Sequence, residues 1–223
     1  MEIAEPSTDD LTAARRRAFV RRWITTVTIA EATGFAIASG FAVLTVALSL
    51  DDPWRLALLV VGGAVEGAAL ATGQYIAMVR NRPRAPVWIG ATAVAASVAW
   101  LLGLLPSTLE LEVDSPGAVA LVVLGAVVLL ASIPCAQWLA LRRPRAFRWV
   151  PTNMAAWSVA VLWTAVPSPF ITEDSPLALI ASLYVVAGLL MAVTIAVLTA
   201  PVARSLFFDP APGPAPDRVD DPR

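Results

Sequence analysis

The sequence predicts an all-α integral membrane protein with six transmembrane helices, arranged as three helical hairpins that are parallel repeats of one another. Hydrophobic residues make up 58% of the chain and charged residues 15%, whereas a soluble domain carries roughly 25% charge. Apolar runs of about 20 residues, the length that crosses a ~30 Å hydrocarbon layer, occur six times. Arginine collects in alternate connections between these runs.

The apolar runs define the predicted domains. The spans are placed at residues 23–48, 54–79, 87–105, 117–141, 149–166 and 177–200. They form a transmembrane domain of residues 23–204, between a cytoplasmic N-terminal tail (1–22) and a disordered, proline-rich cytoplasmic C-terminal tail (205–223). The first run, preceded by arginines, could also be a cleaved signal peptide. It exceeds the ~7–15 apolar residues of such a peptide, and five spans follow, so we expect a retained helix.

The arginine distribution predicts the topology. The chain has no lysine, and its arginines precede the first span or follow the second, fourth and sixth spans, with the single exception of Arg55. Because short loops rich in arginine mark the cytoplasmic side, we expect both termini inside, in the plasma (inner) membrane. The bilayer is then the main partner, and the arginine clusters could contact anionic lipid. Each cluster abuts a span, so nucleic-acid binding is not expected. The sequence leaves the oligomeric state open.

Internal repeats support the hairpin arrangement. The phrase QYIAMVRNRPRAPVW at residues 74–88 returns in shortened form as QWLALRRPRAFRW at residues 137–149. A third, weaker copy gives repeats of about 23–82, 83–143 and 144–204, in which Trp23, Trp88 and Trp149 are equivalent. Each unit enters and leaves on one side, so the repeats are related by an axis along the membrane normal. We interpret the three tryptophans as interface anchors, with their amphipathic indoles at headgroup depth.

The second repeat also carries a resemblance. Gly125, then QWLALRR at residues 137–143, then Trp149 resembles a repeated motif of uncharacterised multi-pass bacterial membrane proteins. The resemblance covers residues 62–168. The chain departs from the motif with Tyr75 in place of Trp in the first copy and Ala200 in place of Gln in the last. The resemblance implies membership of a bacterial membrane family and no particular activity.

Two acids within the predicted spans, Glu31 and Glu66, are the main functional candidates. An ionisable side chain at this depth is costly, by ~2.5–3.5 kcal/mol for Asp, Lys or Arg at a helix centre. We expect the two acids to face each other within the first hairpin and to act as a proton or cation relay. The equivalent positions are Ala96 and Trp157 for Glu31, and Leu129 and Ala192 for Glu66. The alternative is that protonated acids hydrogen-bond neighbouring helices and only hold them together.

Two amides lie near the arginine-rich ends of their spans. Gln74 and Gln137 occupy matching positions in the first two repeats, so both should face the same environment. We predict a polar inner mouth on the bundle axis, with interhelical hydrogen bonds as the alternative.

The composition argues against an enzyme. Histidine is absent and Cys135 is the single cysteine, which removes the usual ligands of metal and haem sites. No catalytic residue, metal site or cofactor is predicted. Because the two acids lie within repeated hairpins, we expect a small proton- or cation-coupled transporter. The alternative is a non-catalytic structural or accessory membrane subunit, and a membrane enzyme is a distant third.

Overall fold

The structure is a computed structural model that describes residues 7–172 and 174–209. Within these residues it contains helices and no strands, as the sequence predicts. The α-helices are α1 (Thr8–Ala47), α2 (Asp52–Ala77), α3 (Ala85–Thr108), α4 (Pro116–Leu141), α5 (Trp149–Ala160) and α6 (Leu177–Phe207). Three short 3-10 helices accompany them, namely η1 (Pro144–Arg148), η2 (Val161–Ala165) and η3 (Ser168–Phe170).

Among the described helices, five are long and apolar enough to cross a membrane: α1, α2, α3, α4 and α6. This agrees with a multi-pass membrane protein. The fifth predicted span, residues 149–166, differs, because α5 ends after 12 residues and continues as η2. The helix tightens shortly before Pro167, and 3-10 turns are frequent at helix C-termini. At 1.5 Å and 2.0 Å per residue the two pieces together measure about 28 Å, so this sixth element is a composite.

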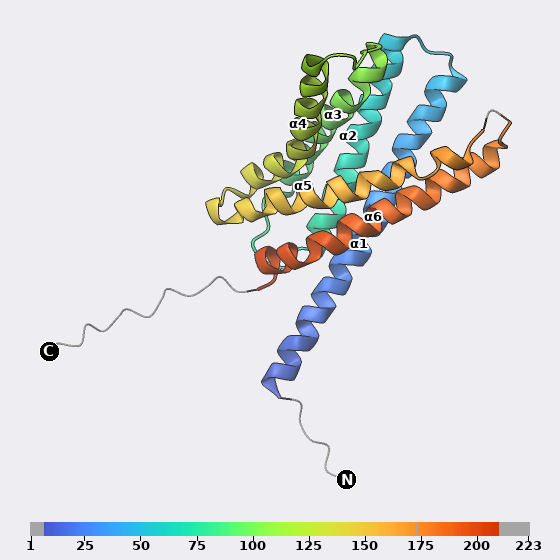
Figure 1. Ribbon diagram of the computed structural model, residues 1–223. Coiled ribbons are helices and arrows are strands. Elements are labelled where there is room, and N and C mark those ends of the chain that lie inside the picture. Colours follow the sequence, from blue (N-terminus) through green and yellow to red (C-terminus); the bar gives the residue numbers. More distant parts are fainter. Residues whose placement is uncertain (1–6, 173, 210–223) are drawn as a thin grey trace.

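The helices form a ring. Each α-helix packs against the next in the chain, and α6 packs back against α1 (Figure 1). The alternating directions give the ring two ends. The arginine-rich end holds the 78–84 and 142–148 connections, and the acidic end holds the 48–51, 109–115 and 166–176 connections. Towards the acidic end, the start of α4 and the α5–α6 hairpin lie on opposite sides of Figure 1.

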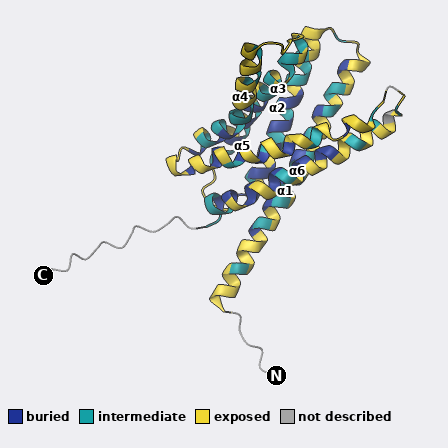
Figure 2. Ribbon diagram, in the orientation of Figure 1, coloured by how far each residue is buried: buried dark blue, intermediate teal, exposed yellow. Residues whose placement is uncertain are grey.

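Parts of both predicted tails are helical in the described part of the chain. Helix α1 begins at Thr8, where the Ser7 hydroxyl caps it by accepting from the Asp10 backbone N–H at 3.1 Å. Residues 8–22 are therefore helical and largely exposed (Figure 2), because charge ends an apolar run without ending a helix. At the other end, α6 continues to Phe207. Residues 1–6 and 210–223, also assigned to the tails, lie outside the described residues.

Glycines bring three of the helices unusually close. A Cβ at Gly73 of α2 would lie 2.7 Å from the backbone oxygen of Thr26 in α1. A Cβ at Gly67 would lie 3.0 Å from the backbone oxygen of Thr92 in α3. Small residues allow such backbone contact between membrane helices. By contrast, nothing lies within 4 Å of a Cβ at Gly125 in α4, so α1, α2 and α3 form the tight side of the ring.

Candidate functional site

An aromatic cluster closes the arginine-rich end of the ring. The indoles of Trp23, Trp88 and Trp149 are fully buried and surround the ring of Phe207, with centroid distances to Phe207 of 6.0, 6.2 and 5.7 Å. We call these four residues the aromatic plug. The sequence predicts these tryptophans to be interface anchors, and in the structure each indole is buried against the other plug residues.

A buried amide network adjoins the aromatic plug. The Gln137 side-chain N–H group donates to Gln74 Oε1 at 2.8 Å and to Thr92 Oγ1 at 3.1 Å. The Gln137 carbonyl oxygen accepts from the Trp149 indole N–H at 2.8 Å. These bonds join α2, α3, α4 and α5. The two glutamines are buried and make interhelical hydrogen bonds, which is one of the two roles considered for them beside a polar inner mouth.

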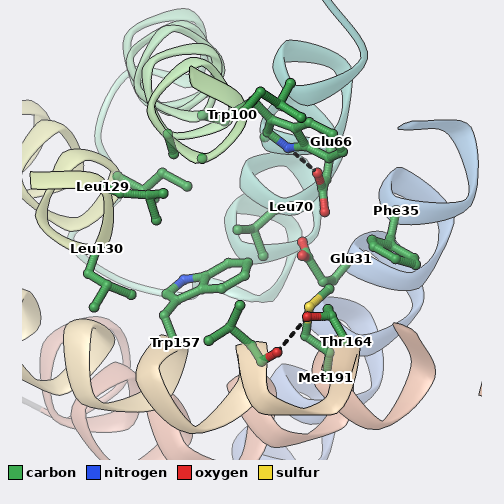
Figure 3. A pocket seen from close by; sticks show the side chains of 17 residues that line it. Glu31, Phe35, Glu66, Leu70, Trp100, Leu129, Leu130, Trp157, Thr164 and Met191 are labelled. Carbon is green, nitrogen blue, oxygen red and sulfur yellow. Dashed lines mark hydrogen bonds between the residues drawn. The ribbon is translucent and has the colours of Figure 1, made fainter. Parts of the chain in front are cut away.

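A cavity of about 320 Å³ lies between the helices, farther from the arginine-rich end than the aromatic plug. All six α-helices and η2 contribute to its wall, which is mostly apolar. Figure 3 shows the side chains that define it: Glu31, Phe35, Glu66, Leu70, Trp100, Leu129, Leu130, Trp157, Thr164 and Met191. The ring of helices therefore surrounds a chamber with two carboxyl groups on its wall.

The two carboxyl groups face each other from α1 and α2 (Figure 3). The close contact of α1 with α2 brings the two carboxyl groups together, since a Cβ at Gly34 of α1 would lie 3.0 Å from Glu66 Cα in α2. Glu66 Oε2 accepts from the Trp100 indole N–H at 2.7 Å. Glu31 is 0% exposed, and neither of its carboxyl oxygens accepts a hydrogen bond from any described residue. Buried polar groups nearly always have a partner. The Trp88 indole N–H of the aromatic plug also lacks one, but Glu31 is the unpartnered group that lines the cavity.

Charge compensation is missing as well. Apart from Glu31 and Glu66, the side chains that line the cavity are uncharged. The arginines of the described residues lie towards the helix ends. The described residues also contain no group of three or more His, Cys, Asp or Glu side chains able to hold a metal ion. A buried carboxylate without a partner is strongly unfavourable. With one shared proton the pair still carries a single negative charge, so a second proton, or a cation that enters the cavity, is needed to neutralise it.

The cavity is partly open to the surface, and its α4 and η2 residues are partly exposed. Leu129, Leu130 and Ile133 of α4 form one side, and Val161 and Thr164 of η2 form the other. Val161 is 45% exposed, so the chamber is not sealed here. Towards the arginine-rich end, the aromatic plug and the amide network fill the axis with fully buried side chains.

Several residues of the site were not predicted from the sequence. Trp100 lies on α3, a different helix from Glu66, and the residues around it in the sequence give no sign of a contact with an acid on α2. Phe207 was assigned to the tail. Trp157 had a signal, since it is the position equivalent to Glu31 in the third repeat, and it lines the cavity.

The comparisons with known proteins add no identity to this geometry. No family model, no curated protein and no solved structure matches the chain.

Proposed function

We propose that the protein is a small membrane transporter that moves protons or another cation, with Glu31 and Glu66 as the carrying groups. One observation carries the proposal. Glu31 is fully buried, lacks a hydrogen-bond donor and faces a cavity whose wall offers no positive charge. Ionisable groups placed in this way inside a helical bundle mark ion and proton pathways.

The two ends of the cavity support a carrier rather than an open pore. The chamber is partly open to the surface, whereas the aromatic plug and the amide network fill the axis towards the arginine-rich end. A carrier must expose its site to one side at a time. In this proposal the structure corresponds to one such state, and the opposite state requires Trp149 of α5 and Phe207 of α6 to separate from Trp23 and Trp88.

We also propose that the bundle consists of three parallel hairpin repeats. Closure of the ring in chain order supports this arrangement. The three equivalent tryptophans meet in one cluster, and Glu31, Ala96 and Trp157, equivalent positions on α1, α3 and α5, all line the cavity. The repeat then supplies the scaffold, and the acids of the first hairpin supply the chemistry.

The proposed orientation places the arginine-rich end in the cytoplasm. A surface groove of about 400 Å³ at this end is lined by Arg16, Arg17, Arg21 and Arg204, which suits the headgroup of an anionic lipid. Anionic lipid should then raise the melting temperature more than zwitterionic lipid does, and Arg17→Gln/Arg21→Gln should reduce that difference. An equal effect of both lipids on the wild type would contradict the contact.

A structural or accessory subunit is the second candidate. The Trp100–Glu66 hydrogen bond favours it, because the Glu66 carboxyl joins α2 to α3. The close contact of Gly34 in α1 with the Glu66 backbone also shows that α1 and α2 pack tightly at this depth. In that case the carboxyl groups contribute stability and carry nothing.

Flux measurements separate the two candidates. Proteoliposomes containing wild type, Glu31→Gln, Glu66→Gln or the double variant would be loaded with a pH-sensitive dye and challenged with proton and cation gradients. Transport predicts flux in the wild type, loss in the double variant, and no change in Glu112→Gln, a matched substitution in an exposed connection. Equal flux in the wild type and the correctly folded double variant, or no flux in any sample, would remove the transport proposal.

A further inference from the structure

We propose that the cavity binds a hydrophobic organic monocation, such as a protonated aromatic amine or a quaternary ammonium compound. The transport of this ligand rests on the proposed function above, but its binding does not. The inference starts from the pairing of an apolar chamber with two carboxyl groups, one of which has no hydrogen-bond donor.

Inorganic cations fit the chamber poorly. Calcium takes six to eight oxygen ligands and magnesium needs a near-ideal octahedron. The wall offers the carboxyl groups of Glu31 and Glu66 and the hydroxyl of Thr164, which already donates to the Val161 backbone oxygen. Most of the other side chains that line the cavity are aliphatic or aromatic. A small ion would lose its water shell here and gain few ligands in return.

An organic cation fits the same wall well. Phe35, Trp100 and Trp157 line the chamber, and aromatic faces attract ammonium groups when water is excluded. The leucines of α4 and Leu70 of α2 offer apolar surface to the rest of such a ligand. A volume of about 320 Å³ is at the small end of the usual range for ligand sites, ~300–1,000 Å³, so the ligand should be a single substituted ring rather than an extended molecule.

Charge then decides between ligands of equal shape. An anion would be repelled by the carboxyl pair, and a neutral molecule would leave the ionised pair without a compensating charge. Apart from protons, a cation is the ligand that supplies this charge, and a site selects best when the wrong ligand leaves buried groups unpaired. The chamber should therefore distinguish a cation from its neutral isostere.

The same carboxyl groups link the ligand to protons. Only the ionised pair attracts a cation, so proton and ligand compete for one site. The other elements face the pair with groups that do not titrate, namely Trp100 of α3, Leu129 of α4, Trp157 of α5, Thr164 of η2 and Met191 of α6. Binding of one cation should therefore release a proton, and the apparent affinity should rise with pH. Transport of the cation would then be exchange against protons.

The test uses two compounds of nearly the same shape, benzyltrimethylammonium and the neutral neopentylbenzene. Binding to the full-length wild type in nanodiscs would be measured by equilibrium dialysis at several pH values, with empty nanodiscs as the blank. We expect the cation to bind at least about tenfold more tightly than the neutral compound, as a desolvated carboxylate and aromatic wall predict. The preference should grow with pH, vanish in Glu31→Gln/Glu66→Gln and persist in Glu112→Gln.

The outcomes separate this inference from transport. Equal binding of the two compounds to the wild type, which needs no variant to fold, would overturn the organic-cation site even if proton flux is observed. Preferential binding of the cation without flux in proteoliposomes would support the site and remove the transporter. Preference for the cation that persists in the double variant would also overturn the inference, because the carboxyl groups would not be its cause.

Discussion

Two regions on the axis of the ring differ in whether their buried polar side chains have hydrogen-bond partners. In the amide network beside the aromatic plug, Gln137 donates to two neighbours and accepts from Trp149. In the cavity, Glu31 is equally buried and accepts from no described residue. Since buried polar groups stabilise a fold only when they are paired, the first region is built to close the bundle. The second region leaves the Glu31 carboxyl group without a partner, and a ligand or a proton can supply one.

The regions also differ in their relation to the repeats. In the proposed three-hairpin arrangement, the aromatic plug uses tryptophans from equivalent positions, whereas the acids occur in the first hairpin alone. A feature present in every repeat suits a scaffold, and one confined to a single repeat suits a specific task. The predictions that follow test whether the aromatic plug side carries stability and the cavity carries recognition.

The largest loss of stability is expected from Trp149→Ala. This indole contacts Trp23, Trp88 and Phe207 and donates to Gln137. Truncation should lower the free energy of unfolding by about 3–5 kcal/mol, measured by denaturant titration in detergent. Trp54→Ala is the matched control, because Trp54 is 70% exposed and its loss should stay within about 0.5 kcal/mol. Similar losses in both variants would contradict a plug that closes the bundle.

A smaller loss is expected from Gly73→Ala. The new Cβ would meet the Thr26 backbone oxygen and the Ala30 side chain, so α1 and α2 must separate, at about 1–3 kcal/mol. The same substitution at Gly125 meets nothing within 4 Å and should raise stability slightly, because alanine favours helix. Thermal unfolding of the two variants side by side checks this. A destabilised Gly125→Ala protein would mean that α4 packs more tightly than described.

Gln137→Leu should cost about 1–2 kcal/mol, because it removes three hydrogen bonds and leaves the buried Trp149 indole N–H without a partner. Binding of the cation in the cavity should be unchanged, since Gln137 does not line it. Parallel unfolding and dialysis measurements check both halves. A variant with normal stability and impaired cation binding would reverse the roles assigned to the two regions.

The smallest effect on stability is expected from Trp100→Phe, which removes the donor to Glu66. One interhelical hydrogen bond in a membrane protein averages about 0.6 kcal/mol. Retained stability together with altered pH dependence of cation binding is the expected result. A loss above about 2 kcal/mol would instead favour the acids as helix contacts, in line with the structural-subunit alternative.

The sequence was sufficient for the helices and for the pairing of the acids, and insufficient for the directions in which side chains point. Apolar length located α1, α2, α3, α4 and α6 because each exceeds the bilayer thickness. Trp23 was assigned to the lipid interface because a tryptophan at a helix end has the same local pattern whether it faces lipid or the axis. In a membrane helix both faces are apolar, so periodicity cannot choose between them. Phe207 and Trp100 act through contacts with distant helices, and such contacts leave no local signal.

The central claim is that the cavity is accessible and negatively charged while the aromatic plug is closed, and cysteine modification tests it most directly. In a Cys135→Ser background, Thr164→Cys lies in the cavity wall and Thr199→Cys lies beside Trp23, whose indole N–H donates to Thr199. Each cysteine variant would be treated with two methanethiosulfonate reagents, one carrying a trimethylammonium group and the other a sulfonate group. Each modification rate would be divided by the rate of the same reagent with a free thiol in solution.

We predict that the cationic reagent modifies position 164 at least about tenfold faster than the anionic one, as field focusing in a charged cleft allows. Glu31→Gln/Glu66→Gln should remove this preference, and position 199 should resist both reagents. Equal normalised rates at position 164, or rapid modification at position 199, would contradict the account.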